Sequence, residues 1–277
     1  MTGGLKKFSS PALNTAEVYD PVADTFTALT AKMTTARNQH AATLLPNGLV
    51  LITGGSPDEN GDGLDTAEVY DPTANKFTAL TATLTTPRGG RTATLLPNGQ
   101  VLLTGGFSND GSLNTAEVYD PTDQTFTALA TTMTTARSGH TATLLPDGQV
   151  LLTGGSSNHT TFNSAEVYDP VHNTFTALTA TMTTARAGHT ATLLPDNQVL
   201  LTGGLIWGTS TFTVLKTAEV YDPVANTFTA LNATMTTARA FHRAALLPND
   251  LVLITGGGYG KSTSSVTILD TAEVYDP

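Results

Sequence analysis

The sequence predicts an all-β protein built from repeated sheets of four antiparallel strands. Three observations lead to this prediction: two short motifs recur at a nearly fixed spacing, the residues between them form four strand-length segments, and no stretch has helical periodicity. Ala-Glu-Val-Tyr-Asp-Pro occurs six times, beginning at Ala16, Ala67, Ala116, Ala165, Ala218 and Ala272. Thr-Gly-Gly also occurs six times, ending at Gly4, Gly55, Gly106, Gly155, Gly204 and Gly257.

The length variation of the repeat is confined to one segment. From each motif alanine to the second glycine that follows, the offset is 39 residues in all five complete copies. From that glycine to the next motif alanine it ranges from 10 to 15 residues. The repeat therefore has a constant part and one variable loop.

Each constant part contains the strands of one sheet. In one copy, residues 140–145 and 149–153 are strand-length and apolar, and Pro-Asp-Gly between them predicts a tight turn. Residues 165–169 alternate in polarity and lead through Pro170 to a fourth strand at 175–178. The second strand is apolar at successive positions, as expected when both faces of a sheet are covered. Such sheets, stacked radially, make a β-propeller.

These motifs resemble the kelch repeat, which has a double glycine after the second strand, a tyrosine on the third, an aromatic residue on the fourth and an arginine before the first. Here these are Gly154 and Gly155, Tyr168, Phe175 and Arg186. Phenylalanine stands where kelch units commonly have tryptophan. The resemblance implies one propeller domain, residues 1–277, of about 5.5 repeats. The repeated residues with an expected structural role are Arg37, Arg88, Arg137, Arg186, Arg239, Glu17, Glu68, Glu117, Glu166, Glu219, Gly54, Gly55, Gly105, Gly106, Tyr19, Tyr70, Tyr119, Tyr168 and Tyr221.

The ends of the chain are offset from the repeat. The sequence contains five copies of the first strand and five of the fourth, but six of the third. We expect five blades, with residues 15–29 completing the sheet begun by residues 240–256 and with residues 271–277 redundant. Six blades, an open array cut from a longer one, or ends that join a neighbouring molecule are the alternatives.

The composition limits the classes of function. A net charge of −10 argues against a general attraction to nucleic acid or anionic lipid. The absence of cysteine excludes disulfides and thiolate sites, including the cysteine-linked tyrosyl cofactor of kelch-like copper radical oxidases. No run has the length of a membrane helix. Low lysine with high threonine and glycine fits a secreted bacterial protein, and the compartment stays open.

All seven arginines lie in the segment that enters the first strand. Four of the five copies read Arg-x-x-His, and Arg91 replaces the histidine in the other. One interpretation is an anion site near the central channel, with Arg91, Arg243, His140 and His189 as ligand-binding residues. The favoured interpretation for the repeated arginines is internal pairing with the repeated glutamates. Histidines spread around a ring of blades are poorly placed to share one metal ion.

The variable loops are the better candidates for recognition, because loops on a rigid scaffold commonly bind ligands. Antiparallel geometry places them at the same end of the sheets as the arginine segments. Two of the loops hold Trp207 and Tyr259, aromatic residues that anchor peptides or stack on sugars. The alternative is that the longest loops fold back and bury these side chains.

One loop resembles the start of a calcium-binding loop. Asp58, Asn60, Asp62 and Asp65 provide oxygen donors around Gly63. The twelfth position of such a loop is Val69 instead of glutamate, so a plain solvated turn is the alternative.

No catalytic motif with asymmetric acid, base or nucleophile is present in the sequence. The leading hypothesis is therefore a non-catalytic scaffold without a cofactor that binds a protein or a glycan through its variable loops. One alternative is a structural protein that assembles through unpaired terminal strands. A second alternative is an enzyme at the channel mouth, similar to kelch-like sugar mutarotases.

Overall fold

The structure is a computed structural model that describes the whole chain except residues 1, 6–9, 21–22, 24, 59–62 and 261–264. Within the described residues the regular elements are β-strands, without an α-helix, as predicted. Contacts group the chain into two compact units, Met1–Ala130 and Thr131–Pro277, and each is described by itself. That residues 1–277 form one domain stays a prediction.

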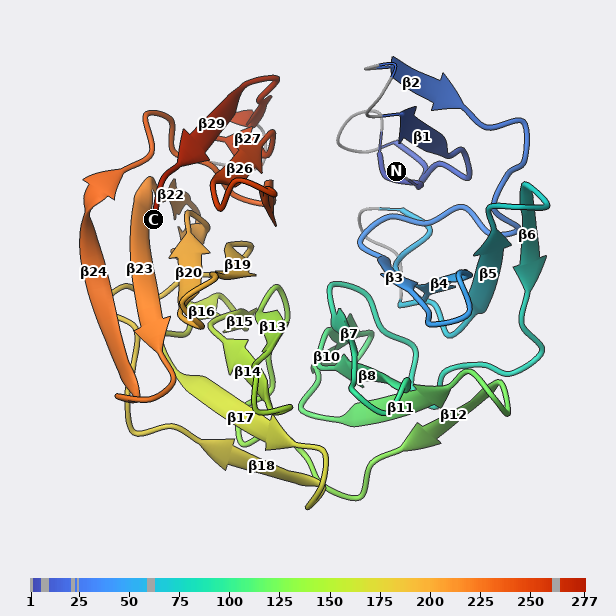
Figure 1. The fold of residues 1–277 in the computed structure, drawn as a ribbon, viewed down its shortest axis with the longest axis horizontal. Coiled ribbons are helices and arrows are strands. Elements are labelled where there is room, and N and C mark those ends of the chain that lie inside the picture. The colour runs from blue at the N-terminus through green and yellow to red at the C-terminus, as the bar shows by residue number, and fades with distance from the viewer. Residues whose placement is uncertain (1, 6–9, 21–22, 24, 59–62, 261–264) are drawn as a thin grey trace. The chain divides into compact units, whose positions relative to one another are not determined.

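Among its described residues, the N-terminal unit contains two two-stranded and two four-stranded antiparallel sheets (Figure 1). The first two-stranded sheet is β1 (Glu17–Asp20) with β2 (Thr25–Ala28). Blade 1 has β3 (Ala41–Leu44), β4 (Val50–Thr53), β5 (Ala67–Asp71) and β6 (Lys76–Ala79). Blade 2 has β7 (Thr92–Leu95), β8 (Val101–Thr104), β11 (Ala116–Asp120) and β12 (Thr125–Ala128). A hairpin of β9 (Phe107–Ser108) and β10 (Gly111–Ser112) follows β8.

The C-terminal unit contains two four-stranded sheets and one three-stranded sheet. Blade 3 has β13 (Thr141–Leu144), β14 (Val150–Thr153), β17 (Ala165–Asp169) and β18 (Thr174–Ala177). Blade 4 has β19 (Thr190–Leu193), β20 (Val199–Thr202), β23 (Thr217–Asp222) and β24 (Thr227–Thr234). Blade 5 has β25 (Arg243–Leu246), β26 (Val252–Thr255) and β29 (Ala272–Tyr275). Hairpins of β15 (Ser156–Ser157) with β16 (Thr160–Thr161), β21 (Leu205–Trp207) with β22 (Phe212–Val214), and β27 (Gly258–Tyr259) with β28 (Thr267–Ile268) fill the variable loops.

The prediction of five blades is confirmed, but the predicted use of the terminal strands is wrong. Residues 271–277 are not redundant, because β29 pairs with β26 and takes the third position of blade 5, with Val252 opposite Tyr275. In the N-terminal unit, β1 and β2 pair with each other. The sequence of β29 has the same alternation as the third strands of blades 1 to 4. It therefore pairs with the second strand of its own blade, β26, as they do with theirs.

The turn between the first two strands forms for a local reason. In blade 3 the Asp147 carboxylate accepts a hydrogen bond from the Gln149 backbone N–H (3.0 Å), and Gly148 has a φ of +85°. Glycine adopts this left-handed conformation without steric cost. The turn fixes the register that places Thr141 opposite Thr153.

The apolar core lies between neighbouring sheets. In the N-terminal unit, Leu45 and Leu51 of blade 1 pack in one buried cluster with Val101, Leu103 and Tyr119 of blade 2. The second strands of blades 2, 3 and 4 are buried along their whole length, which explains their continuous apolar sequence. Burial between sheets therefore leaves the strand ends and loops as the accessible parts of the repeat.

Candidate binding surface

The variable hairpins and the arginine-containing linkers lie at the same end of the blades, as the antiparallel geometry predicts. In each of the five blades a linker residue forms a backbone bridge with the residue that starts the variable loop. The pairs are Asn38 with Ser56, Gly89 with Phe107, Ser138 with Ser156, Ala187 with Leu205, and Ala240 with Gly258. We call this end of the blades the loop surface.

The repeated arginines form buried ion pairs with the repeated glutamates inside each blade. Arg186 in blade 4 donates from Nη2 to Glu219 (2.6 Å) and from Nη1 to the Gly203 carbonyl oxygen (2.7 Å). The same carboxylate accepts hydrogen bonds from the backbone N–H groups of Thr183 (2.6 Å) and Thr184 (3.0 Å). Burial lowers the pKa of Arg186, and Glu219 opposes this shift. The equivalent pairs are Arg37–Glu68, Arg88–Glu117, Arg137–Glu166 and Arg239–Glu273.

These pairs change the expected electrostatics of the loop surface. The five repeated arginine side chains are fully buried, so they do not present an open ring of positive charge. In blade 4 the Arg186 guanidinium donates to the glycine after the second strand and to Thr217 and Glu219 of the third strand. Because Arg186 belongs to the linker and Glu219 accepts from the linker N–H groups, these bonds hold the three segments together. This arrangement fits the favoured interpretation of internal pairing.

Two histidines of the Arg-x-x-His pattern, His189 and His242, connect neighbouring blades. In blade 4 the Nε2 of His189 lies 3.0 Å from Thr153 Oγ1 and 3.2 Å from Thr141 Oγ1, both in blade 3. His242 in blade 5 makes the same contacts with Thr202 (3.0 Å) and Thr190 (3.1 Å) of blade 4. Burial lowers the pKa of His189 well below its usual value and that of His242 to about 4, and nearby arginines add to both shifts. Both rings are therefore neutral at pH 7.

Arg91 takes the histidine position in blade 2 and also reaches the preceding blade. Its guanidinium donates to the Thr53 carbonyl oxygen and hydroxyl in blade 1, and to the Arg88 carbonyl oxygen (3.1 Å). Burial is the main cause that lowers its pKa to about 9, and Arg88 and Arg37 contribute. Arg91, His140 and His189 are buried residues. Ligand binding by these three residues stays a prediction, and they lie outside the exposed surface described next.

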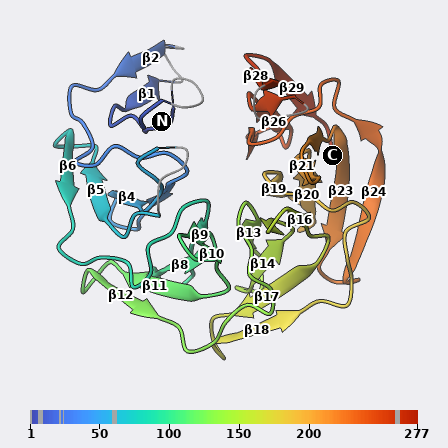
Figure 2. The ribbon, with the colours of Figure 1, turned by 180° about the vertical axis from the view of Figure 1, so that it is seen from behind.

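Aromatic side chains gather on the hairpins of blades 3 and 4. The Trp207 ring packs edge-to-face against Phe212, with centroids 5.5 Å apart, and against His159, with centroids 6.2 Å apart. The backbone N–H of Trp207 donates to Thr161 Oγ1 (2.8 Å), so strands β16 and β21 lie side by side (Figure 2). Trp207 is half-buried, so its exposure lies between the exposed and the buried side chain that the sequence analysis considered. The exposed His159 is a member of this cluster that the sequence reasoning missed.

Blade 5 adds two exposed aromatic residues and one exposed cation. Tyr259, predicted as a ligand-binding residue, is 46% exposed in β27, and Arg243 is exposed at the start of β25. Phe241 is 61% exposed and was not predicted. It has a φ of +56° and donates its backbone N–H to the Gly188 carbonyl oxygen (2.7 Å). A bulky residue in this conformation is rare and marks a candidate functional position.

The signal for Phe241 was present in the sequence. The position two residues after the repeated arginine is Gln39 in blade 1 and Phe241 in blade 5. Blades 2, 3 and 4 have glycine there, as Gly90, Gly139 and Gly188. All five have positive φ values, and the backbone of Gly188 also donates to Gly139 (2.8 Å). A repeat position that favours glycine but contains phenylalanine departs from the local rule.

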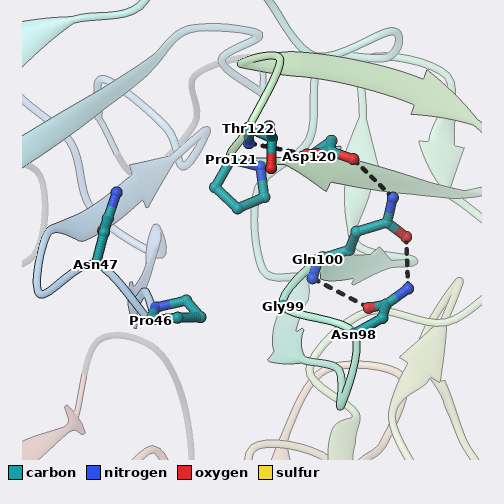
Figure 3. A pocket seen from close by; sticks show the side chains of 8 residues that line it. All are labelled: Pro46, Asn47, Asn98, Gly99, Gln100, Asp120, Pro121 and Thr122. Atoms are coloured by element: carbon teal, nitrogen blue, oxygen red, sulfur yellow. Dashed lines mark hydrogen bonds between the residues drawn. The ribbon is translucent and has the colours of Figure 1, made fainter.

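A polar pocket lies at the opposite end of blades 1 and 2 (Figure 3). Its volume is about 600 Å³, and turns that include Pro46, Asn98 and Pro121 line it. Gln100 Nε2 donates to Asp120 (3.0 Å), and this hydrogen bond is the main cause that lowers the pKa of the Asp120 carboxyl. Asn98 Nδ2 donates to Gln100 (2.9 Å). These polar groups thus satisfy one another.

The predicted calcium loop lies partly outside the described residues. Asn60 and Asp62 belong to the segment that the structure does not describe. Asp58 accepts hydrogen bonds through its backbone oxygen, from Ser56 (2.6 Å) and Asn38 (2.9 Å). Among the described residues, no group of three histidine, aspartate or glutamate side chains is arranged to hold a metal ion. Calcium binding stays a prediction.

Repeated four-stranded blades, a double glycine after each second strand and a buried arginine–glutamate pair in each blade define a kelch-type β-propeller. The sequence model of the KLHDC2/KLHL20/DRC7 Kelch-repeats domain matches residues 1–204, and the chain belongs to this family. No curated protein matches the sequence. Across the described parts of the chain, no helix has the length and apolar character needed to cross a membrane.

Proposed function

We propose that this chain is a non-catalytic kelch scaffold that binds a protein through the loop surface of blades 3 to 5. The observation that carries the proposal is the group of exposed or half-exposed aromatic residues there, Trp207, Phe241 and Tyr259. Aromatic residues on a rigid framework are typical anchors of protein interfaces. The family supports this proposal, because kelch propellers are commonly interaction scaffolds.

The placement of the repeated polar residues favours binding over catalysis. Arginine, glutamate and histidine are the groups that acid–base chemistry would use. Here the repeated ones are engaged inside or between blades, as in the Arg186–Glu219 pair and the His242–Thr202 contact. The exposed residues of the loop surface that are named above are instead aromatic residues and one cation, Arg243.

The binding site is testable by photo-crosslinking from two ends of the same blade. A crosslinking residue at Thr213, on the exposed side of β22, should capture one partner species from extracts of the source cells. The same residue at Val224, in the turn at the opposite end of blade 4, should not capture it. Trp207→Ala should reduce capture from Thr213 at least about 10-fold, as expected for an interface anchor. Equal capture from both ends would contradict the proposal.

A glycan ligand is the second form of this proposal, since aromatic faces also stack on sugars. A glycan array distinguishes the two forms. Binding of one glycan class that Trp207→Ala and Tyr259→Ala remove would identify a sugar ligand. No array signal, together with partner capture at Thr213, would identify a protein.

A second candidate function is self-assembly, which the terminal sheets favour. Phe26 in β2 is 60% exposed, whereas Phe77 at the same position of blade 1 is 7% exposed. Exposed apolar positions on short edge sheets are typical association surfaces. Absolute mass over a concentration series tests this candidate: species above 28.8 kDa that grow with concentration support it, and a monomer throughout contradicts it.

A further inference from the structure

The outermost strand of blade 4 is longer than its counterparts in blades 1 to 3. β24 has eight residues, whereas β6, β12 and β18 each have four. It is the last strand in the order β19-β20-β23-β24, so one side of its backbone forms the edge of this sheet (Figures 1 and 2). At the usual rise per residue this edge is about 27 Å long. Propellers normally leave only short, protected strand edges, and β24 departs from that rule.

The sequence of β24 lacks the residues that protect strand edges in other proteins. It reads Thr-Phe-Thr-Ala-Leu-Asn-Ala-Thr, without a charged residue or a proline. Six of the eight residues are exposed, and the other two, Phe228 and Leu231, are half-buried. In blade 1 the short edge strand β6 instead begins with Lys76. A long exposed edge without charge or proline is open to pairing with another strand.

The register of β24 shows which backbone groups face this open edge. In blades 1 to 3 the leucine after the fourth strand donates its backbone N–H to the first alanine of the third strand, at 2.9 Å. Because alternate residues of a strand point the same way, residues two and four positions before that leucine also face the third strand. In blade 4 the leucine is Leu231, and these residues are Thr229 and Thr227, in a stretch of regular register. Phe228 and Ala230 therefore direct their N–H and C=O groups to the open edge.

We propose that β24 pairs antiparallel with the β24 strand of a second copy of the chain along this edge. The pairing is centred on Thr229, which lies opposite Thr229 of the second copy. Phe228 then lies opposite Ala230, and these two residues exchange both of their backbone hydrogen bonds. The two four-stranded sheets join into one continuous sheet. The pairing uses neither the loop surface nor the sheet of β1 and β2, so it goes beyond the proposed function.

The choice of a second copy as the occupant follows from the sequence of the edge. Two copies with a net charge of −10 each repel one another in general, but β24 brings no like charges face to face. The pairing sets the large Phe228 beside the small Ala230 and threonine beside threonine, a favourable cross-strand pair. One chain contains a single β24, so the pairing requires a second chain. Because identical surfaces meet around a two-fold axis, assembly stops at the dimer.

A single cysteine tests the geometry, because the chain contains none. Residues opposite each other at the centre of such a pair have Cβ atoms about 4.5 Å apart, close to the distance that a disulfide spans. Under a mild oxidant, Thr229→Cys should form a disulfide-linked dimer at least about 10-fold faster than Thr176→Cys, because pairing raises the effective concentration. Thr176 has the same place in the short edge strand β18. Equal rates would overturn the proposal.

A proline on the edge tests the hydrogen bonds. Ala230→Pro removes an N–H that faces the open edge, a position where strands tolerate proline. Ala177→Pro makes the same change in blade 3 and is the matched control. Sedimentation velocity over a concentration series should show a dimer of twice 28.8 kDa for wild type and Ala177→Pro, and a monomer for Ala230→Pro.

A charge on the edge tests the same contact without proline. Ala230→Lys keeps the N–H and should also be a monomer, because a lysine there opposes edge pairing. Partner capture from Thr213 should be unchanged in this variant, which separates this edge from binding at the loop surface. Dimers that persist in both Ala230→Pro and Ala230→Lys would overturn this interface and leave assembly through β1 and β2 standing. A wild type that is monomeric at all concentrations would overturn both.

Discussion

The linker before the first strand and the variable loop after the second strand lie at the same end of each blade, yet they differ in almost every property. The linker repeats its arginine in every blade and buries it completely. The hairpin changes in length and sequence from blade to blade and keeps aromatic side chains at the surface, such as Tyr259. Repeated polar residues thus stabilise the scaffold, and residues that break the repeat are the candidates for recognition.

The largest expected effect concerns the buried ion pair. Arg186→Ala leaves Glu219 buried without its charged partner, which should lower the free energy of unfolding by about 3–5 kcal/mol. Arg243→Ala removes an exposed arginine of the same unit and should change it by no more than about 0.5 kcal/mol. Denaturant unfolding of both variants measures the difference. Equal losses would show that burial of the pair does not distinguish the two arginines.

The second prediction is a pH dependence that originates between blades. The pKa of His242 is about 4 in the folded chain, against 6.5 for an unperturbed histidine, so the unfolded chain binds more protons between these values. The stabilising contribution is complete above about pH 6.5 and is lost as the pH falls toward 4, by about 3 kcal/mol in total. Burial is the main cause of the lowered pKa, Arg239 and Arg243 also disfavour the charged ring, and Glu273 opposes them.

His242→Gln keeps a polar group beside Thr202 but does not titrate, so unfolding measured from pH 7.5 to 4 should show a shallower loss than wild type. A profile that is unchanged in His242→Gln would contradict the assignment to this residue.

The smallest expected effect on stability is that of Phe241→Gly. Glycine at the equivalent positions of blades 2, 3 and 4 adopts the same left-handed conformation without strain. The substitution relieves this strain, which stabilises the fold, and removes the phenyl ring that packs beside Gly188, which destabilises it. Because the two effects oppose each other, the free energy of unfolding should change by less than about 1 kcal/mol. Thermal unfolding checks this, and a loss above about 2 kcal/mol would place Phe241 in the scaffold instead of the binding surface.

The sequence predicted the blades well because their determinants are local. The turn at Gly148, the apolar second strand and the alternation around Tyr168 all act within a few residues. The positions of the variable loops followed from the same pattern.

The contacts that sequence reasoning missed join residues far apart in the chain. His189 meets a threonine pair in the preceding blade, 36 and 48 residues away, and no local pattern encodes that distance. The third-strand position of β29 was mispredicted because the motif at 272 is equally compatible with pairing to β26 and with redundancy. His159 was missed because its role depends on a hairpin of the next blade.

The most direct test of the division between scaffold and recognition combines stability and capture in one variant. Phe241→Gly should unfold at nearly the wild-type midpoint and lose most of the partner captured from a crosslinking residue at Thr213. If the variant keeps full capture, or loses capture only in proportion to a loss of folded protein, then the residues that break the repeat do not form the binding surface.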